Sequence, residues 1–267
     1  MSFSFFLTVA GMFVIPFFAV LIPLFIGQRH GISSGKKSAD IPEKPVDGAV
    51  GVSFGLLAFM LALTFQLVSN RFEVRKQLLL DEVSAIRTGY LRAGLIPEPY
   101  RSNTKKFLIE YVDQRSGKFA DRDEINRVIN ESQKILDSVW TYAEALAAQD
   151  RSSEVYALYT TSINEIIDAH NQRISTALQY RIPPAIIIVL FIIEFFSMLV
   201  LGYQFGLAGK RSPSMSLALA IIFAVVMFLI VALDRPELGV SRLSQKPMKT
   251  LQDQLHGRQI DIQSINR

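Results

Sequence analysis

Residues 182–209 read IPPAIIIVLFIIEFFSMLVLGYQFGLAG, a stretch of 28 residues in which Glu194 is the single charged side chain. A helix needs about 20 mainly apolar residues to cross the hydrocarbon core of a bilayer. Buried helices of soluble proteins are normally shorter than this stretch. It therefore predicts a transmembrane helix.

Three further stretches carry no charged side chain at all, and each is long enough to span a bilayer: residues 1–28, 48–70 and 212–233. The first has no basic segment at its start and no clean small-residue cleavage site, so we read it as a retained span and not as a secretory signal. The four spans are expected at about residues 4–27, 48–69, 183–205 and 213–233.

The composition of the 267-residue chain limits the chemistry available to it. Charged residues make up 19% of the chain, against about a quarter in soluble domains. The absence of cysteine excludes disulfides and thiolate metal sites. The three histidines lie far apart, and no phosphate-binding loop or hydrolase motif occurs. We therefore expect no metal, no cofactor and no enzymatic activity.

The segment 71–181 has the character of a soluble helical domain. It holds sixteen basic and sixteen acidic residues, so it is neutral and lacks the basic face of a nucleic-acid-binding protein. Its apolar residues recur at helical spacing, and no alternating pattern predicts a strand. A long helix should continue from the second span to near Gly94, and another should follow Pro97-Glu98-Pro99. Two later helices should be capped by Asp121 or Asp123, and by Ser152 or Ser153.

These observations predict an all-α membrane protein with four transmembrane helices and a helical soluble domain inserted between the second and third spans. The expected domains are a transmembrane hairpin at 1–70, the soluble domain at 71–181, a second hairpin at 182–234 and a polar tail at 235–267. The tail is either a short amphipathic helix on the soluble domain or disordered. Nine basic residues flank the spans on the side of the soluble domain and six on the other, which favours a cytoplasmic soluble domain.

Small residues on the second span suggest two alternatives. Gly51, Gly55, Ala58 and Ala62 are spaced by four, three and four residues, so they share one helical face. This face either packs within the chain or surrounds a symmetry axis and lines a pore. In the second case Phe54, Phe65 and Gln66 are candidates for a constriction, because hydrophobic rings can gate by dewetting.

Charged residues at and within the spans also have more than one interpretation. In an oligomer, Arg71, Arg75 and Lys76 would form a basic ring that favours anions; otherwise they anchor the span on its positive-inside flank. An intramembrane carboxylate facing lipid is costly. Glu194 is therefore either part of an ion or proton pathway, or a protonated acid hydrogen-bonded to a neighbouring helix, or an acid that lies nearer the membrane interface.

Two blocks of sequence resemble a bacterial membrane family of unknown function, the bestrophin-like family. One block contains DEVSAIRTGYLRAGLIPEPYR at 81–101, and the other runs from RIPPAIIIVL at 181–190 through LDRPELG at 233–239 to the QKP of 245–247. The residues that carry the resemblance are Glu82, Arg87, Tyr90, Arg92, Asp234, Arg235 and Pro236. Asp234 and Arg235 are candidates for an ion pair at the membrane face, with Arg71 or Arg181 nearby.

The resemblance implies a relation to the bestrophins, which are pentameric anion channels with four spans and a large helical region. By this analogy the chain forms a homo-oligomer, a pentamer, in a bacterial inner membrane, with lipid and a small inorganic ion as partners and no nucleic acid. The chain lacks an acidic calcium-binding run, so calcium gating is not implied. The leading hypothesis is an ion channel lined by the second span; the alternative is a non-conducting sensor or interaction protein, and a membrane enzyme is the least supported.

Overall fold

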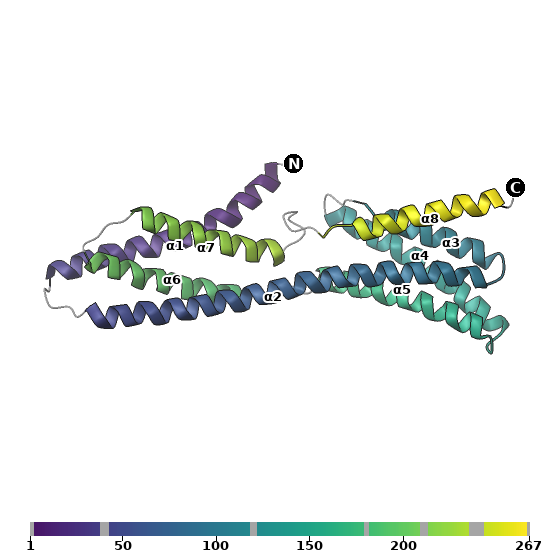
Figure 1. Ribbon diagram of the computed structural model, residues 1–267, viewed down its shortest axis with the longest axis horizontal. Helices are drawn as coiled ribbons and strands as arrows, with labels where there is room; N and C mark the ends of the chain where they lie inside the picture. The colour runs from purple at the N-terminus through teal and green to yellow at the C-terminus, as the bar shows by residue number, and fades with distance from the viewer. Residues whose placement is uncertain are drawn as a thin grey trace. The chain divides into compact units, whose positions relative to one another are not determined.

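The computed structural model of the protein describes residues 3–37, 43–117, 122–178, 182–208, 213–234 and 243–265 (Figure 1). These residues form eight α-helices and one short 3₁₀ turn, and no strand occurs in them. Four of the helices are long and apolar enough to cross a membrane, which confirms the predicted fold class. The chain divides into two compact units, a membrane unit (1–72 and 181–242) and a helical unit (73–180 and 243–267).

The membrane unit contains α1 (Phe3–Lys37), the first part of α2 (Glu43–Arg92), α6 (Pro184–Leu207) and α7 (Pro213–Asp234). Helix α1 lies along both α6 and α7 (Figure 1). Pro184 occupies the first turn of α6, where a missing N–H costs nothing because it would have no helical partner. The core is aliphatic, with Leu24, Leu57, Leu190 and Met198 among its buried residues.

Two hydrogen bonds set the register between α2 and α6. Gln204 Nε2 donates to Asp47 Oδ1 at 2.6 Å, and Ser197 Oγ donates to the carbonyl oxygen of Ser53 at 3.2 Å. Residue numbers rise along α2 while they fall along α6, so the two helices run antiparallel.

The helical unit contains the second part of α2, a 3₁₀ turn η1 (Ala93–Leu95), α3 (Tyr100–Arg115), α4 (Arg122–Gln149), α5 (Glu154–Leu178) and α8 (Lys246–Ile265). The predicted long helix is confirmed, since α2 continues without a break to Arg92. Helix α3 begins directly after Pro97-Glu98-Pro99. Ser153 caps α5 as predicted, because its hydroxyl accepts from the backbone N–H of Tyr156 at 3.3 Å.

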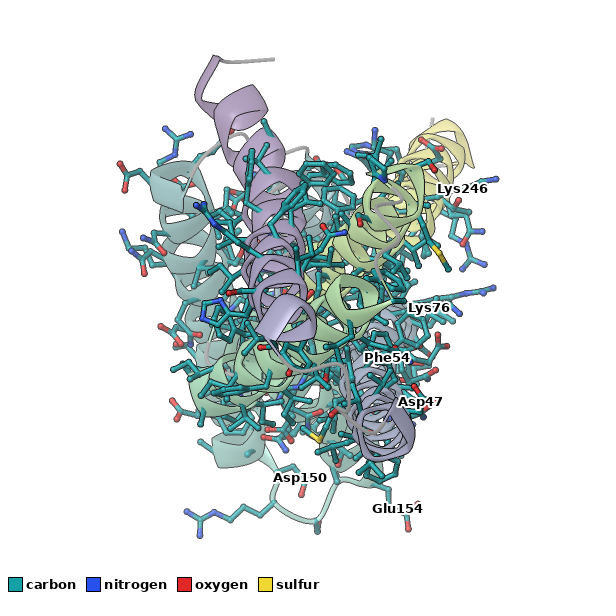
Figure 2. The ribbon with its side chains drawn as sticks, turned by 90° about the vertical axis from the view of Figure 1, so that its left-hand side faces the viewer. Asp47, Phe54, Lys76, Asp150, Glu154 and Lys246 are labelled. Atoms are coloured by element: carbon teal, nitrogen blue, oxygen red, sulfur yellow. The ribbon has the colours of Figure 1, made fainter. Side chains whose placement is uncertain are left out.

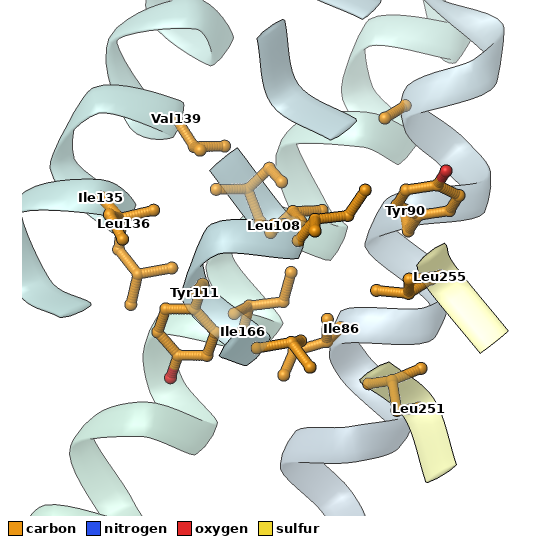
Figure 3. Close-up of a cluster of buried hydrophobic side chains, with 14 of the residues drawn as sticks. Ile86, Tyr90, Leu108, Tyr111, Ile135, Leu136, Val139, Ile166, Leu251 and Leu255 are labelled. Atoms are coloured by element: carbon orange, nitrogen blue, oxygen red, sulfur yellow. The ribbon is translucent and has the colours of Figure 1, made fainter. Parts of the chain in front are cut away.

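Large side chains fill the core of the helical unit (Figure 3). Tyr111 and Leu136 are fully buried, and Ile86 and Tyr90 line the α2 side. Of the two alternatives for the C-terminal tail, the structure has the helix: α8 contributes the buried Met248, Leu251 and Leu255 to this core. Their spacing of three and four residues gives α8 one apolar face.

Candidate functional site on helix α2

Helix α2 is the least covered of the four apolar helices. In its most apolar stretch 11% of the residues are buried within the chain, against 28% in α1 and 33% in both α6 and α7. A helix that its own chain leaves so open must meet lipid, water or a second copy of the chain. This exposure makes α2 the first place to look for a functional surface.

Three faces follow one another around α2, each built on the same four-three-four spacing. The packed face carries Leu57, Leu61, Thr64 and Val68. Leu61 is half-buried, and the other three are buried against the rest of the unit. A second face carries bulky apolar side chains, among them Val52 and Phe59, which are 75% and 60% exposed. The third face carries the small residues singled out from the sequence, each one position before a bulky residue. Since successive residues turn by about 100°, the small and bulky faces lie side by side.

The small-residue face is open. A Cβ atom added at Gly51 or Gly55 would meet nothing within 4 Å, and Ala58 and Ala62 are exposed. Of the two alternatives for this face, packing inside the chain finds no support among the described residues. Phe65 and Gln66 are also exposed on the flanks of this face.

Phe54 of α2, labelled in Figure 2, is half-buried. By helical spacing it lies at the edge of the small-residue face. Its ring meets Phe223 of α7 edge to face, with ring centroids 6.3 Å apart. The contact holds the Phe54 ring against α7 of the same chain. Phe54 therefore lies at the border between the packed face and the open small-residue face of α2.

Glycines that the sequence analysis passed over make the tightest contact of the membrane unit. A Cβ at Gly27 of α1 would lie 2.0 Å from the carbonyl oxygen of Leu199, and one at Gly202 of α6 would lie 2.1 Å from that of Leu24. Gly31 and Gly206 are equally tight. The signal was present, because each pair is spaced by four residues in the manner of small-residue helix contacts. We call Gly27, Gly31, Gly202 and Gly206 the glycine seam.

The three candidates for a basic ring differ in their surroundings. Arg71 Nη1 lies 3.9 Å from Asp234 Oδ1, and the same carboxylate oxygen accepts from the backbone N–H of Ile182 at 3.1 Å. Arg75 is buried. Lys76 is exposed and pairs with Glu73 one turn away at 2.9 Å. By helical spacing Lys76 is the member that shares the small-residue face, fourteen residues after Ala62.

Glu194 lies in the interior of the membrane unit. Its side chain is 1% exposed, and neither carboxyl oxygen has a hydrogen-bond partner among the described residues. It lies one turn before Ser197, on the face of α6 that meets α2. The hydrogen bond to a neighbouring helix that one interpretation requires is therefore not found within the described residues.

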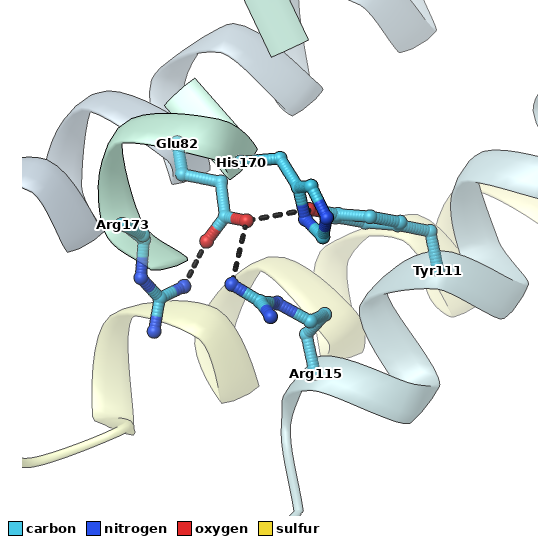
Figure 4. A network of polar contacts seen from close by, with 5 residues as sticks. All are labelled: Glu82, Tyr111, Arg115, His170 and Arg173. Atoms are coloured by element: carbon cyan, nitrogen blue, oxygen red, sulfur yellow. Dashed lines mark hydrogen bonds and ion pairs between the residues drawn. The ribbon is translucent and has the colours of Figure 1, made fainter. Parts of the chain in front are cut away.

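A second buried glutamate lies in the helical unit and has three donors (Figure 4). Glu82 of α2 is fully buried. Its Oε1 accepts from the Tyr111 hydroxyl at 2.5 Å and from Arg115 Nη2 at 3.1 Å, and its Oε2 accepts from Arg173 Nη1. His170 Nδ1 lies 2.8 Å from the Tyr111 oxygen. We call these five residues the Glu82 network; it ties α2 to α3 and α5.

The hydrogen bonds of the network determine its protonation pattern. Tyr111 has one hydroxyl proton, which it donates to Glu82, so its oxygen must accept from His170 Nδ1–H. This leaves Nε2 of His170 as the unprotonated ring nitrogen, and it is buried without a partner in the described chain. Burial, and then the charge of Arg115, lowers the pKa of His170 to about 4. Burial also raises the pKa of Tyr111 to about 12.

The remaining residues of the resemblance have structural contacts of their own. Tyr90 is buried, with Lys105 Nζ 5.3 Å from its ring centre, a cation–π geometry. Arg92 donates to the carbonyl oxygen of Leu158 at 3.2 Å. Arg87 is exposed and borders α8. Arg235 and Pro236 lie outside the described residues.

Comparison with known proteins agrees with this architecture. The family profile described as the Bestrophin-like domain matches residues 15–248. A bacterial Bestrophin homolog from Klebsiella pneumoniae superposes with a TM-score of 0.60 at 15% identity, covering 89% of this chain and 96% of that one. A crystal structure described as a membrane protein superposes with a TM-score of 0.62 at 14% identity, covering 96% and 98%. At such identities the likeness shows a shared fold.

A search of the curated proteins gives no match.

Proposed function

The chain belongs to the Bestrophin-like family, and on that premise we propose that it forms a homo-oligomeric ion channel whose pore is lined by α2. The observation that carries the proposal is the open small-residue face of α2. Gly51, Gly55, Ala58 and Ala62 leave room beside the helix that no other part of the described chain fills. In a ring of copies, such faces leave space along the axis, while the bulky face next to each meets lipid or the neighbouring copy.

The analogy with bestrophins supports a pentamer. Phe65 and Gln66 flank the small-residue face, so a ring of five copies would set five phenylalanines near the axis. A ring of apolar side chains can close a narrow pore by excluding water, and Phe65 is the better placed of the two phenylalanine candidates. Phe54 would act at the border, where Phe223 already holds its ring.

Anion selectivity rests on Lys76 more than on its two basic neighbours. Lys76 shares the small-residue face, whereas Arg71 lies beside Asp234 and Arg75 is buried. The exposed pair with Glu73 is weak, since such pairs contribute about 0.2–1 kcal/mol and are screened by salt. The side chain is therefore available to attract an anion at the end of the span. The excess of basic flanking residues supports an orientation with the helical unit in the cytoplasm, where it would form a vestibule. The bestrophin analogy supports a bacterial inner-membrane location.

Reconstitution into liposomes tests the proposal directly. We expect chloride to leave loaded liposomes faster than potassium, and the purified protein to have the mass of five chains in native mass spectrometry. The absence of flux for any small ion across a range of pH and voltage would refute the channel. A monomeric or dimeric protein that recovers one stoichiometric partner would instead support the non-conducting sensor.

A further inference from the structure

Within the helical unit, α2 and α8 border a groove of about 400 Å³ that the proposed pore does not use. Its volume lies in the range of small-molecule pockets. The lining comes from two sequence blocks more than 150 residues apart: Val83, Arg87, Lys246, Pro247, Thr250, Leu251 and Gln254. Arg87 and the Lys246-Pro247 pair both belong to the blocks that carry the family resemblance.

The charge of the groove has one sign. Arg87 and Lys246 line it, and no acid does. Neither residue has an acidic neighbour three or four positions away on its own helix, where surface ion pairs form. Within the described chain neither makes a salt bridge. Two cations therefore share one small space, and none of the described lining residues supplies a counter-charge.

The next helical turn adds further positive charge. Tyr90 follows Arg87 by one turn and carries Lys105 over its ring, while Arg258 follows Gln254 by one turn on α8. Burial lowers the pKa of Lys105, and the charges of Arg101 and Arg258 act in the same direction, against the opposing charge of Glu98. Arg258 of α8 thus adds a further positive charge near Lys105 and Tyr90.

The remaining lining residues suit the uncharged, mainly apolar part of a ligand. Val83, Pro247 and Leu251 give an apolar wall, and Thr250 and Gln254 add a hydroxyl and an amide. A guanidinium binds a carboxylate or phosphate through two parallel N–H groups, and an ammonium adds a point charge. Helix α8 begins at Lys246, so the positive end of its helix dipole lies at this end of the groove.

We propose that this groove binds a small organic anion, with a phosphate or carboxylate head between Arg87 and Lys246 and a short apolar body on Val83, Pro247 and Leu251. The head could come from a free metabolite-sized anion or from an anionic lipid. The chemistry at the groove is the same for both sources, and two arms of the experiment separate them.

Calorimetric titration of the full-length protein in nanodiscs of neutral lipid tests the site. The probes are phenyl phosphate, inorganic phosphate and benzyltrimethylammonium, which are all water-soluble. We expect phenyl phosphate to bind, inorganic phosphate to bind more weakly because it lacks the apolar body, and the cation not to bind. Nanodiscs that contain phosphatidylglycerol form the second arm. If phosphatidylglycerol weakens the binding of phenyl phosphate, the natural ligand is an anionic lipid. If binding is unchanged, the natural ligand is a soluble anion. Both outcomes support the oxyanion site.

Variants of the two cations make the test specific. Arg87→Gln and Lys246→Gln should each weaken phenyl phosphate binding about five- to tenfold, the loss expected for one charge-assisted hydrogen bond at a partly exposed site. Lys249→Gln is the matched control, because Lys249 lies in the same turn of α8 but does not line the groove. No binding of phenyl phosphate to the wild type in neutral nanodiscs, or equal losses for Lys249→Gln, would overturn the proposal. The outcome is independent of whether the protein conducts ions.

Discussion

The membrane unit and the helical unit each hold their helices together by a different means. In the membrane unit the closest approach is made where side chains are absent, at the glycine seam between α1 and α6. In the helical unit the closest ties are made by side chains, in a core of large residues and in the Glu82 network. In a bilayer the hydrophobic effect does not drive helices together, so backbone contact takes over that role. In water the hydrophobic effect does drive helices together, and large apolar residues are therefore what holds the helical unit.

The two buried glutamates show the same difference. Glu82 has donors from Tyr111, Arg115 and Arg173, whereas Glu194 has none among the described residues. A buried carboxylate with two guanidinium partners is a structural element whose loss leaves charges unpaired. A buried carboxyl group without partners lowers the stability of the fold, so its presence is better explained by another use. Helix α2 belongs to both units, and its open small-residue face is the part that neither kind of packing uses.

The largest effect should come from Glu82→Gln. The change leaves the buried Arg115 and the half-buried Arg173 without a charge partner, and breaking a buried pair in this way costs about 3–5 kcal/mol. Thermal unfolding followed by the fluorescence of Trp140, the single tryptophan, reports on the helical unit because its ring packs on that core. Glu73→Gln on the same helix is the control, since its exposed pair with Lys76 should cost less than about 1 kcal/mol. Equal losses for the two variants would contradict the account of the network.

Acidic pH should lower the unfolding free energy of the helical unit, because His170 is buried in its neutral form. Its pKa is about 4 in the folded protein against 6.5 for an ordinary histidine, so the unfolded chain binds the proton more strongly. The stability is fully present above pH 6.5 and falls as the pH falls towards 4, by about 3 kcal/mol in total.

His170→Asn isolates this contribution because an amide N–H can replace Nδ1–H while the titrating ring is removed. The unfolding midpoint of the variant, measured by Trp140 fluorescence between pH 7 and 4, should depend less on pH than that of the wild type. An unchanged slope in His170→Asn would contradict the prediction.

Replacing glycine by alanine should lower the stability of the protein in the glycine seam and raise it on the small-residue face of α2. Gly202→Ala puts a Cβ 2.1 Å from a backbone oxygen of α1, and overpacking of this kind costs about 1–3 kcal/mol. Gly55→Ala meets open space, and replacing a helical glycine by alanine stabilises by about 0.5–1 kcal/mol. Thermal denaturation of both variants in detergent measures the difference. A destabilised Gly55→Ala that keeps its oligomeric mass would show that the face is packed within the chain.

Glu194→Gln should have the smallest effect on stability. The substitution preserves shape, and no hydrogen bond or ion pair of the described chain is lost, so the unfolding free energy should change by less than about 1 kcal/mol. Ion flux in liposomes should change instead if the carboxyl group lies on an ion or proton pathway. A loss of stability as large as that of Glu82→Gln would show that Glu194 has a partner from another copy.

The sequence predicts the positions of the helices far better than it predicts which side chains meet between them. Long charge-free stretches identify the four spans, and Pro97-Glu98-Pro99 and Ser153 mark helix starts, because these signals act within a few residues. The Glu82 network joins residues 29 to 91 positions apart, and nothing local indicates which arginine meets which acid. For the glycine seam the spacing was visible, but which helices face each other is decided by tertiary packing. Tyr111 and Arg115 therefore emerge as network residues from the structure alone.

The most direct test of the central claim uses the absence of cysteine from the chain. Ala58→Cys places a thiol on the small-residue face, and Phe59→Cys places one on the bulky face one position further on. After reconstitution, a charged methanethiosulfonate reagent should block chloride flux through Ala58→Cys and leave flux through Phe59→Cys unchanged. Block of Phe59→Cys alone, or of neither variant despite labelling of both thiols, would contradict a pore lined by the small-residue face of α2.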